Sequence, residues 1–495
     1  MIEKNNPNDS NDASFFVFLS LIKKIRPINL QKKHMDNNKI SRREALKGLF
    51  FAGVGFATGG MLLNAQVAPA RAGATPVPWT EAPDGTKIDT RTWSKMGETL
   101  GLLGMGCMRL PTVGAGGGGG FGRRQPLDQE ATNAMIDYAI AHGVNYFDTA
   151  PAYGESEVVT GKALSRHPRN SFKIATKMSN MSGRPTLEAG QQMFETSLKN
   201  LQVEYVDFLL LHNLQNLAGF NTRFRDNGLF DWLLEQKSKG RIKHLGFSFH
   251  GTNADFPALV DLYDWDFIQI QLNYADWKDM SAGWGGNSGK TSSEYLYNYL
   301  VEKGIPALVM EPVKGGALAN VSEGVASVLR ERHPELTPAA NALTFVGSLP
   351  GVMITLSGMS NMDQLKENVS LFTNFKPFND SDMAFMHNVA DLYKSKGQIP
   401  WTACAYCMPC PAGVDIPGNF KIFNSDSDAL LTSETNRADV IEKRKDFLKQ
   451  YNAQEKAVRA DACIGCEICL DKCPQHISIP QHMVRIRDLA AKIQG

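Results

Sequence analysis

Apolar and polar positions alternate in blocks from about residue 100 to residue 375. Short runs rich in Val, Ile, Leu and Phe predict eight strands, at 100–110, 144–149, 172–177, 206–212, 244–249, 267–273, 305–311 and 352–357. Amphipathic stretches predict eight helices, at 128–142, 155–165, 187–201, 229–239, 254–263, 292–303, 322–332 and 362–371. This alternation is typical of βα units around a parallel sheet. Eight units in about 300 residues predict a (β/α)8 barrel with α/β architecture.

An open, doubly wound parallel sheet is the alternative that the same alternation leaves possible. No G-x-G-x-x-G follows the first predicted strand, so a nucleotide site of the Rossmann type is unsupported. The glycine run 116–120 has no Lys-Ser/Thr after it, and its composition predicts a flexible loop instead of a phosphate loop.

Polar residues close three of the predicted strands. Asp148 ends the second strand, Lys177 ends the third and His212 ends the fourth, while Tyr153 lies in the loop after the second strand. In a (β/α)8 barrel the carboxyl ends of all strands meet at one mouth, where the chemistry is carried out. Taken singly, each residue could be a helix cap or a polar core residue. Together they predict one active site.

These four segments resemble the aldo-keto reductase family over roughly residues 90–375. The resemblance implies carbonyl reduction or alcohol oxidation with a nicotinamide cofactor, NADH or NADPH. A tyrosine can give the carbonyl oxygen its proton, but its ordinary pKa of about 10 is high for transfer near neutrality. We therefore expect Lys177 to lower the pKa of Tyr153, Asp148 to hold Lys177, and His212 to orient the carbonyl.

The resemblance also implies a set of nicotinamide contacts. It assigns the carboxamide to Ser248 and Gln269, although Phe249 stands where the family usually has asparagine. The remaining positions of the cofactor site, along the pyrophosphate and the adenosine, are Val313, Lys314, Gly316, Gly358, Ser360, Gln364 and Asn368. Gly358 and Gln364 occupy places where many NADPH-specific relatives carry Lys and Arg, so the choice between NADPH and NADH stays open.

Seven of the eight cysteines lie after residue 400 in two arrays with the spacing of metal ligands. Cys463, Cys466, Cys469 and Cys473 form a C-x2-C-x2-C-x3-C-P run, the bacterial ferredoxin signature for a 4Fe–4S cluster. The other array consists of Cys404, Cys407 and Cys410. Zinc is the competing metal, but so many cysteines would over-supply one tetrahedral ion.

The first array is one cysteine short of the layout found in relatives that combine this barrel with a ferredoxin region. Trp401 stands at the missing position. The crossed ligation of two-cluster ferredoxins would join Cys410 to Cys463, Cys466 and Cys469, leaving Cys404, Cys407 and Cys473 for a second cluster. We therefore expect one or two clusters, the second of them incomplete, labile or absent.

The amino-terminal 72 residues predict an export signal. A twin-arginine motif at Arg42-Arg43 precedes the apolar stretch 49–63 and a small-residue cleavage site at Ala70-Arg71-Ala72. The apolar stretch is short for a bilayer span, so no stable membrane anchor is expected. The signal predicts a bacterial periplasmic location, and Met35 is a more ordinary start than Met1.

Charge and composition limit the partners. Lys and Arg number 52 and Asp and Glu 51, so no electrostatic feature predicts a nucleic-acid partner. We expect the barrel at 73–380, with a small carbonyl or alcohol substrate, and a mostly helical ferredoxin-type domain at 381–495, with a possible redox protein partner. The alternative function is an exported electron-transfer or partner-docking protein whose barrel does not turn over.

Overall fold

The computed structural model describes residues 80–113, 126–180, 185–280, 291–395, 397–399, 401, 405–432, 435–473 and 477–494. The predicted export signal at 1–72, the glycine run 116–120 and Cys404 lie outside these described residues. No helix among the described residues is long and apolar enough to cross a bilayer.

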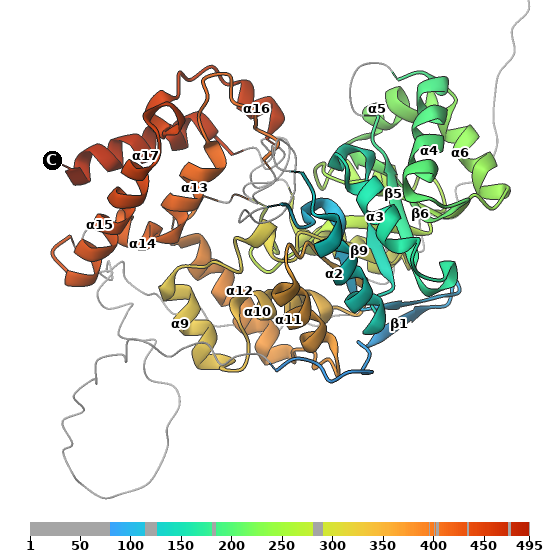
Figure 1. Cartoon of the computed structure of the whole chain (residues 1–495), viewed down its shortest axis with the longest axis horizontal. Helices are drawn as coiled ribbons and strands as arrows, with labels where there is room; N and C mark the ends of the chain where they lie inside the picture. Colours follow the sequence, from blue (N-terminus) through green and yellow to red (C-terminus); the bar gives the residue numbers. More distant parts are fainter. Residues whose placement is uncertain are drawn as a thin grey trace, which may run out of the picture. The chain divides into compact units, whose positions relative to one another are not determined.

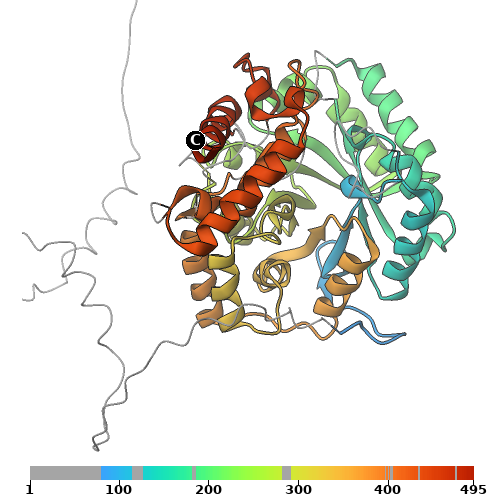
Figure 2. The ribbon, with the colours of Figure 1, turned by 60° about the vertical axis from the view of Figure 1, so that its left-hand side comes forward.

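Eight parallel strands close into a barrel in the order β10-β3-β4-β5-β6-β7-β8-β9 (Figure 1; Figure 2). Closure confirms the predicted (β/α)8 fold and excludes the open sheet. The strands are β3 (Leu103–Gly106), β4 (Tyr146–Asp148), β5 (Lys173–Met178), β6 (Val206–Leu214), β7 (Ile242–Phe249), β8 (Phe267–Gln271), β9 (Ala307–Met310) and β10 (Val352–Ser357).

All eight predicted helices are present, seven of them between barrel strands along the chain and the eighth after β10. They are α2 (Gln129–Ala141), α3 (Ser156–Leu164), α4 (Leu187–Leu201), α6 (Leu229–Ser238), α7 (Phe256–Val260), α8 (Ser293–Lys303), α9 (Glu323–Arg332) and α11 (Met362–Phe372). Side-chain caps fix several starts. Asp128 accepts a hydrogen bond from the amide of Ala131, and Thr186 accepts one from the amide of Ala189.

The structure corrects the first predicted strand and adds elements that the pattern missed. The stretch 100–110 is divided among the end of β2 (Glu98–Gly101), β3 and the short helix η3 (Cys107–Arg109). Strands β1 (Thr90–Trp93) and β2 form an antiparallel hairpin. Its Glu98 contacts Lys173 and His244, near the amino ends of β5 and β7, so the hairpin covers the end of the barrel opposite the predicted active site.

Two layers of apolar side chains hold the barrel together. Side chains such as Tyr146, Phe208 and Phe267 fill its interior. A larger cluster packs the outer helices against the sheet, and it includes Ala342, Leu343, Phe345 and Val346 of the unpredicted helix α10 (Pro338–Gly347). This filled interior leaves only the carboxyl-end mouth for a site.

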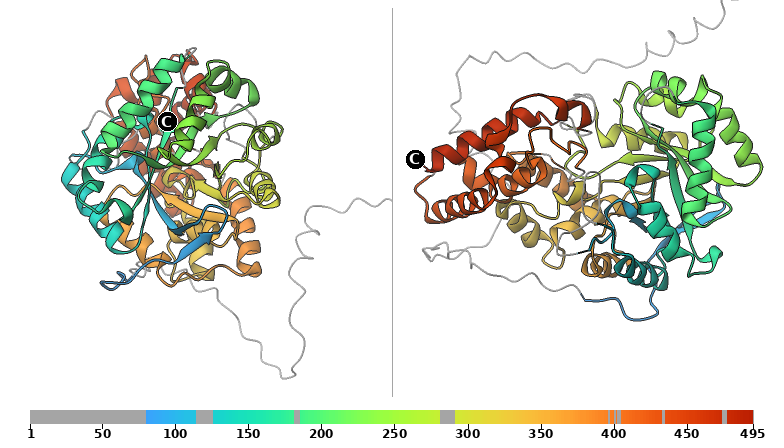
Figure 3. Two further views of the ribbon diagram at one scale, coloured as in Figure 1. Left: turned by 90° about the vertical axis from the view of Figure 1, so that its right-hand side faces the viewer. Right: turned by 45° about the horizontal axis from the view of Figure 1, so that its top comes forward.

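The carboxyl-terminal region is helical and has a core of its own. Its helices are α12 (Asp380–Ser395), α13 (Ile416–Ser425), α14 (Ser427–Leu431), α15 (Ala438–Ala453), α16 (Ile468–Lys472) and α17 (Ile479–Gln494). Helix α12 packs on the barrel core, whereas the helices from α13 onward gather around Phe420, Phe447 and Met483 (Figure 3). Two of the cysteines, Cys407 and Cys473, are buried in this second core.

Candidate active site

A buried ion pair joins the ends of two neighbouring strands. Asp148 is the last residue of β4, and Lys177 lies near the end of β5. The Lys177 ammonium donates to Asp148 Oδ1 at 2.5 Å and to the main-chain oxygen of Thr149 at 2.9 Å. The two charged side chains are 1% and 7% exposed, so each charge depends on the other for its stabilisation.

The other two predicted catalytic residues lie against this pair. Tyr153 is in the short helix η4 (Pro151–Tyr153) that follows β4. The Lys177 Nζ atom is 5.1 Å from the centroid of the Tyr153 ring. The His212 ring, from β6, meets the Tyr153 ring edge to face with centroids 5.8 Å apart. The structure therefore brings all four residues together, although 64 positions separate Asp148 from His212.

Burial sets the protonation of Tyr153. Burial raises the pKa of the Tyr153 phenol well above its ordinary value, and Asp148 and Tyr406 raise it further. The expected lowering of this pKa by Lys177 is not what the structure shows. The Lys177 charge is offset by Asp148, while the phenol is removed from water. Tyr153 therefore holds its proton at neutral pH.

His212 is held neutral. Burial lowers the pKa of His212 well below its ordinary value, and the nearby Lys177 lowers it further. Its Nδ1 atom is 2.6 Å from the hydroxyl of Ser179. A neutral imidazole can orient a carbonyl oxygen by a hydrogen bond without adding a charge to the site.

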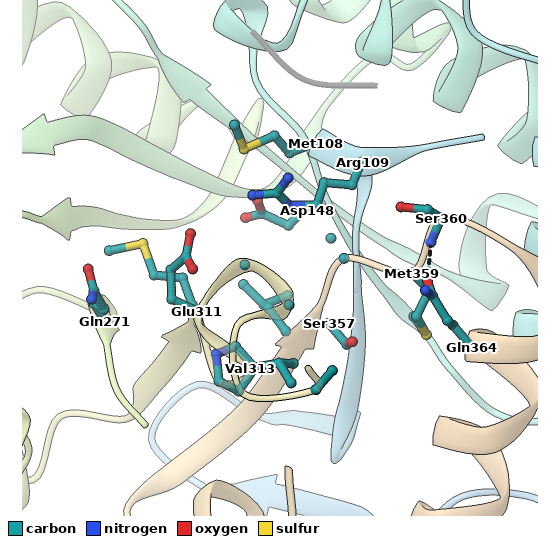
Figure 4. A pocket seen from close by; sticks show the side chains of 18 of the residues that line it. Met108, Arg109, Asp148, Gln271, Glu311, Val313, Ser357, Met359, Ser360 and Gln364 are labelled. Atoms are coloured by element: carbon teal, nitrogen blue, oxygen red, sulfur yellow. Dashed lines mark hydrogen bonds between the residues drawn. The ribbon is translucent and has the colours of Figure 1, made fainter. Parts of the chain in front are cut away.

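A cavity of about 410 Å³ opens beside these residues (Figure 4). Such a volume fits a small ligand. Asp148, Tyr153 and His212 line it, whereas Lys177 lies behind them. Eight of the nine predicted cofactor residues also line it: Ser248, Gln269, Val313, Gly316, Gly358, Ser360, Gln364 and Asn368.

Several of these residues are positioned by hydrogen bonds to one another. Gln269 Nε2 donates to Asp148 Oδ2 at 3.2 Å, which links the predicted carboxamide site to the ion pair. On the far side of the cavity, the Ser360 amide donates to Gln364 Oε1 at 2.8 Å (Figure 4). Asn368 donates to the Ser357 hydroxyl at 2.9 Å. The polar lining is thus ordered before any ligand binds.

Lys314 is the predicted cofactor residue that the structure places elsewhere. Its ammonium donates to both carboxylate oxygens of Asp276, at 2.8 and 2.6 Å, and its side chain is 2% exposed. Burial alone raises the pKa of Asp276, but Lys314 and the amides of Asn273 and Gln271 outweigh it and hold this pKa below its ordinary value. The placement argues against the expected pyrophosphate contact, because a structural carboxylate already satisfies the ammonium.

The cavity also contains residues that the sequence reasoning did not select. Among them are Arg109 from η3, Met310 and Glu311 at the end of β9, His250 after β7, and Tyr406. Glu311 closes its predicted strand as Asp148 does, so the same criterion could have found it. Tyr406 lies between Cys404 and Cys407 in the sequence, and nothing in this segment predicts that its side chain lines the cavity.

Four cysteines from both arrays surround a second, smaller cavity. Cys410, Cys463, Cys466 and Cys469 line it together with apolar side chains such as Ile464 and Met483. No three Cys, His, Asp or Glu side chains among the described residues lie close enough to hold a single metal ion. Four cysteine side chains around one apolar cavity would, as thiolates, match the donor set of a cubane cluster. The grouping is the one implied by crossed ligation.

The family comparisons agree with this geometry. Residues 104–391 match the model of the aldo/keto reductase family, and residues 402–477 match that of a 4Fe–4S dicluster domain. The chain belongs to the aldo/keto reductase family. It is an NAD(P)-dependent oxidoreductase with a carboxyl-terminal 4Fe–4S domain.

Named relatives match most of their own length. "Probable aldo-keto reductase 1" of Glycine max is 32% identical over 301 residues, covering 55% of this chain and 81% of that protein. L-galactose dehydrogenase of Arabidopsis thaliana is 26% identical, covering 58% and 89%. NADH-specific methylglyoxal reductase of Escherichia coli is 26% identical, covering 59% and 95%.

The buried Lys314–Asp276 pair predicts a stability defect. Lys314→Met leaves the Asp276 carboxylate buried without its cation, and we expect a loss of about 3–5 kcal/mol in the free energy of unfolding. Lys303→Met is the matched control, because Lys303 pairs with Asp261 at an exposed site and its replacement should leave the free energy of unfolding nearly unchanged. Urea unfolding of both variants measures the difference. A normal stability with a raised nicotinamide KM would instead restore the pyrophosphate role.

The environment of His250 predicts a pH-dependent stability. Burial lowers the pKa of His250 to about 3, whereas the unfolded chain takes up this proton near the ordinary value of 6.5. Stability is therefore lost as the pH falls below 6.5. From pH 7 to pH 5 the wild type should lose about 2 kcal/mol more than His250→Gln in urea unfolding. Parallel pH curves for the two proteins would contradict this assignment.

Proposed function

We propose that this protein is an exported carbonyl reductase that uses NADH. One observation carries the proposal: Tyr153 lies close to both the Lys177 ammonium and the His212 ring, and it lines a cavity of ligand size. A proton donor, a cation and a neutral imidazole at one mouth supply what carbonyl reduction requires from the protein.

Each active-site residue has its own role in the proposed reaction. A nicotinamide cofactor, when bound in this cavity, would supply the hydride that the carbonyl carbon accepts. Tyr153 gives its proton to the carbonyl oxygen, and the product is an alcohol. Its raised pKa keeps the proton on the phenol until negative charge develops on that oxygen. His212 orients the oxygen, and Lys177, held by Asp148, stabilises the phenolate that forms.

The preference for NADH is argued from charge. Recognition of the 2′-phosphate of NADPH ordinarily uses Arg or Lys. The segment that runs along the expected adenosine site carries Gly358, Ser360 and Gln364 instead, and Gln364 accepts a hydrogen bond from Ser360. The methylglyoxal reductase of Escherichia coli, a relative over most of its length, is described as NADH-specific.

For the carboxyl-terminal domain we propose one complete and one incomplete cluster. Cys410, Cys463, Cys466 and Cys469 would hold the complete 4Fe–4S cluster. Cys407 and Cys473, both buried, would share the second cluster with Cys404. Trp401 has a buried indole nitrogen without a hydrogen-bond partner in the described structure, and an indole cannot replace the missing thiolate.

An electron-transfer function is the second candidate, and a surface feature favours it. Cys466 is exposed, and the neighbouring Ile464 and Ile468 side chains are 73% and 45% exposed. Apolar side chains beside a cluster offer a docking surface to a redox protein. A hydride carries two electrons and a cluster normally takes one, so the two sites would work independently unless a flavin-like carrier joined them.

Periplasmic location forms part of the proposal and depends on the twin-arginine motif at Arg42-Arg43. That route carries folded proteins, which suits a chain whose clusters are assembled in the cytoplasm. No stable membrane anchor is proposed.

Removal of the Tyr153 hydroxyl tests the proposed reductase activity. Tyr153→Phe should lower kcat for aldehyde reduction by at least about 100-fold, because general acid catalysis contributes that much. Nicotinamide binding, followed by fluorescence, should stay unchanged. Tyr295→Phe, on an exposed position of α8, is the control and should keep full activity. If the wild type oxidises no nicotinamide with any aldehyde, or if Tyr153→Phe is fully active, the electron-transfer function takes precedence.

Iron content tests the ligand assignment. Cys466→Ser should lose roughly four iron atoms per chain, the content of one cubane cluster. Cys107→Ser, at a buried cysteine within the barrel, should keep all of the iron. Trp401→Cys should supply the missing ligand and stabilise the second cluster, giving a new 4Fe–4S signal in electron paramagnetic resonance after chemical reduction. Two complete 4Fe–4S clusters in the wild type would overturn the assignment.

A further inference from the structure

Two side-chain oxygens in the wall of the active-site cavity have no hydrogen-bond partner in the described part of the chain. They are Gln271 Oε1 and Glu311 Oε2, both removed from solvent, and both residues line the cavity. A buried polar atom without a partner costs free energy, and native structures contain few of them. Two such atoms in the cavity that Tyr153 lines therefore point to a polar group of a bound ligand.

Adjacent strands bring these two side chains to one side of the cavity. Gln271 is the last residue of β8, and it pairs with Met310, the last residue of β9. Glu311 follows Met310 directly, so both side chains start at the carboxyl end of the barrel. In Figure 4 the Gln271 and Glu311 side chains lie on the same side of the cavity. Neighbouring strands are about 4.8 Å apart, so one small ligand can contact both.

The buried Lys314–Asp276 pair fixes the orientation of the Gln271 amide. Gln271 Nε2 donates to Asp276 Oδ2 at 3.0 Å. Because an ionised carboxylate only accepts hydrogen bonds, the amide nitrogen must face Asp276, which leaves Oε1 for the cavity. Asn273 Nδ2 connects the same carboxylate to the main-chain oxygen of Glu311, at 2.9 and 3.1 Å. The ion pair thus positions both residues before a ligand binds.

The main chain at Glu311 is strained. Its φ of 59° lies in the left-handed region, where a non-glycine residue is uncommon. Such strain is found at functional sites, where neighbouring contacts maintain it. Here the Asn273 side chain and the main-chain amide of Lys314 both donate to the Glu311 main-chain oxygen. Besides burial, the charge of Glu311 raises the pKa of Tyr153, so the carboxyl group is close to the proton donor.

We propose that Gln271 and Glu311 bind a hydroxyl group of the substrate beside its reacting carbonyl, so that these two residues select hydroxy-aldehydes and hydroxy-ketones. This inference rests on the proposed reductase function. A hydroxyl group both donates and accepts hydrogen bonds. It can donate to Gln271 Oε1, which only accepts, and it can pair with Glu311 whether the carboxyl group is neutral or ionised.

A substrate ammonium and the cofactor ribose are the alternative ligands of this pair. An ammonium would need an ionised carboxylate, whereas burial raises the pKa of Glu311 and favours the neutral acid, although Arg109 and Lys314 oppose this increase. The ribose hydroxyls of a nicotinamide cofactor share the chemistry of a substrate hydroxyl. Measuring the substrate preference and the NADH affinity of the same variant distinguishes these two sources.

Two ketones of similar shape provide the test. Hydroxyacetone carries a hydroxyl group where 2-butanone carries a methyl group. In the full-length holoprotein, Glu311→Met should lower the ratio of kcat/KM for hydroxyacetone to that for 2-butanone by about tenfold, as expected for one lost hydrogen bond. Glu311→Gln keeps a polar group and should retain most of the preference. Glu331→Met, the same replacement at an exposed position of α9, is the control and should leave the ratio unchanged.

Three results would overturn the inference. An unchanged ratio in Glu311→Met would show that the carboxyl group does not bind the hydroxyl. If that unchanged ratio came with weaker NADH binding, measured by fluorescence, Glu311 would be assigned to the cofactor ribose. A wild type without preference for hydroxyacetone would exclude the hydroxyl site even if neither variant folded.

A wild type that reduces neither ketone would contradict the reductase proposal for these compounds and leave the hydroxyl site to a binding measurement. The NADH-bound protein cannot reduce an alcohol, so it is titrated with 1,2-propanediol and with 2-butanol and followed by nuclear magnetic resonance. The wild type should bind the diol about tenfold more tightly, and Glu311→Met should lose this difference. Equal affinities of the wild type for the two alcohols would refute the hydroxyl site.

Discussion

The Lys177–Asp148 ion pair is the constraint on which the active site depends. Two charges removed from water cost several kcal/mol each unless they are paired and hydrogen-bonded. Here Thr149 and Gln269 complete the pair, so it ties β4, β5 and β8 together at the mouth of the barrel. Tyr153 packs directly on the ammonium, and its position follows from that of the pair.

The burial that raises the free energy of the two charges also determines the protonation of Tyr153 and His212. Water is excluded from the phenol and from the His212 ring, so both groups are held in their neutral forms. The sequence reasoning attributed the tuning of Tyr153 to the nearest cation alone. In the folded protein the carboxylate of Asp148 accompanies that cation, and desolvation exceeds the effect of either charge.

Periodicity predicted the barrel, and the strand ends, together with the family resemblance, pointed to four residues that the structure brings together at its mouth. Each barrel strand has two buried faces and therefore a continuous apolar run, and its last polar residue is visible in the sequence. Helix α10 was missed because nearly all of its residues are buried, which removes the amphipathic pattern. The hairpin β1–β2 has strands of only four residues, too short for a clear alternation.

Some residues are positioned by packing between segments that are distant in the sequence. The neighbouring residues in the sequence did not indicate where their side chains lie. Lys314 carries the charge expected of a pyrophosphate contact, yet its side chain turns inward to Asp276, a choice that only the fold determines. Arg109 enters the cavity because Gly358, far away in sequence, leaves room for its side chain. Tyr406 belongs to a cysteine array and nevertheless lines the reductase cavity. Cysteine spacing, by contrast, is visible in the sequence, and the resemblance to two-cluster ferredoxins implied the group of four cysteines that lines the second cavity.

The proposed carbonyl reduction and the iron–sulfur cluster use different sets of side chains. The four residues proposed for carbonyl reduction lie near the ends of barrel strands or in the segment after one, whereas Cys410, Cys463, Cys466 and Cys469 surround a different cavity. Tyr406 is the described cysteine-array residue that lines the reductase cavity. Cys407, the next residue after Tyr406, is buried in the carboxyl-terminal core. The packing of that core therefore helps to position Tyr406 in the wall of the reductase cavity. Electron exchange is not needed for the two domains to depend on one another.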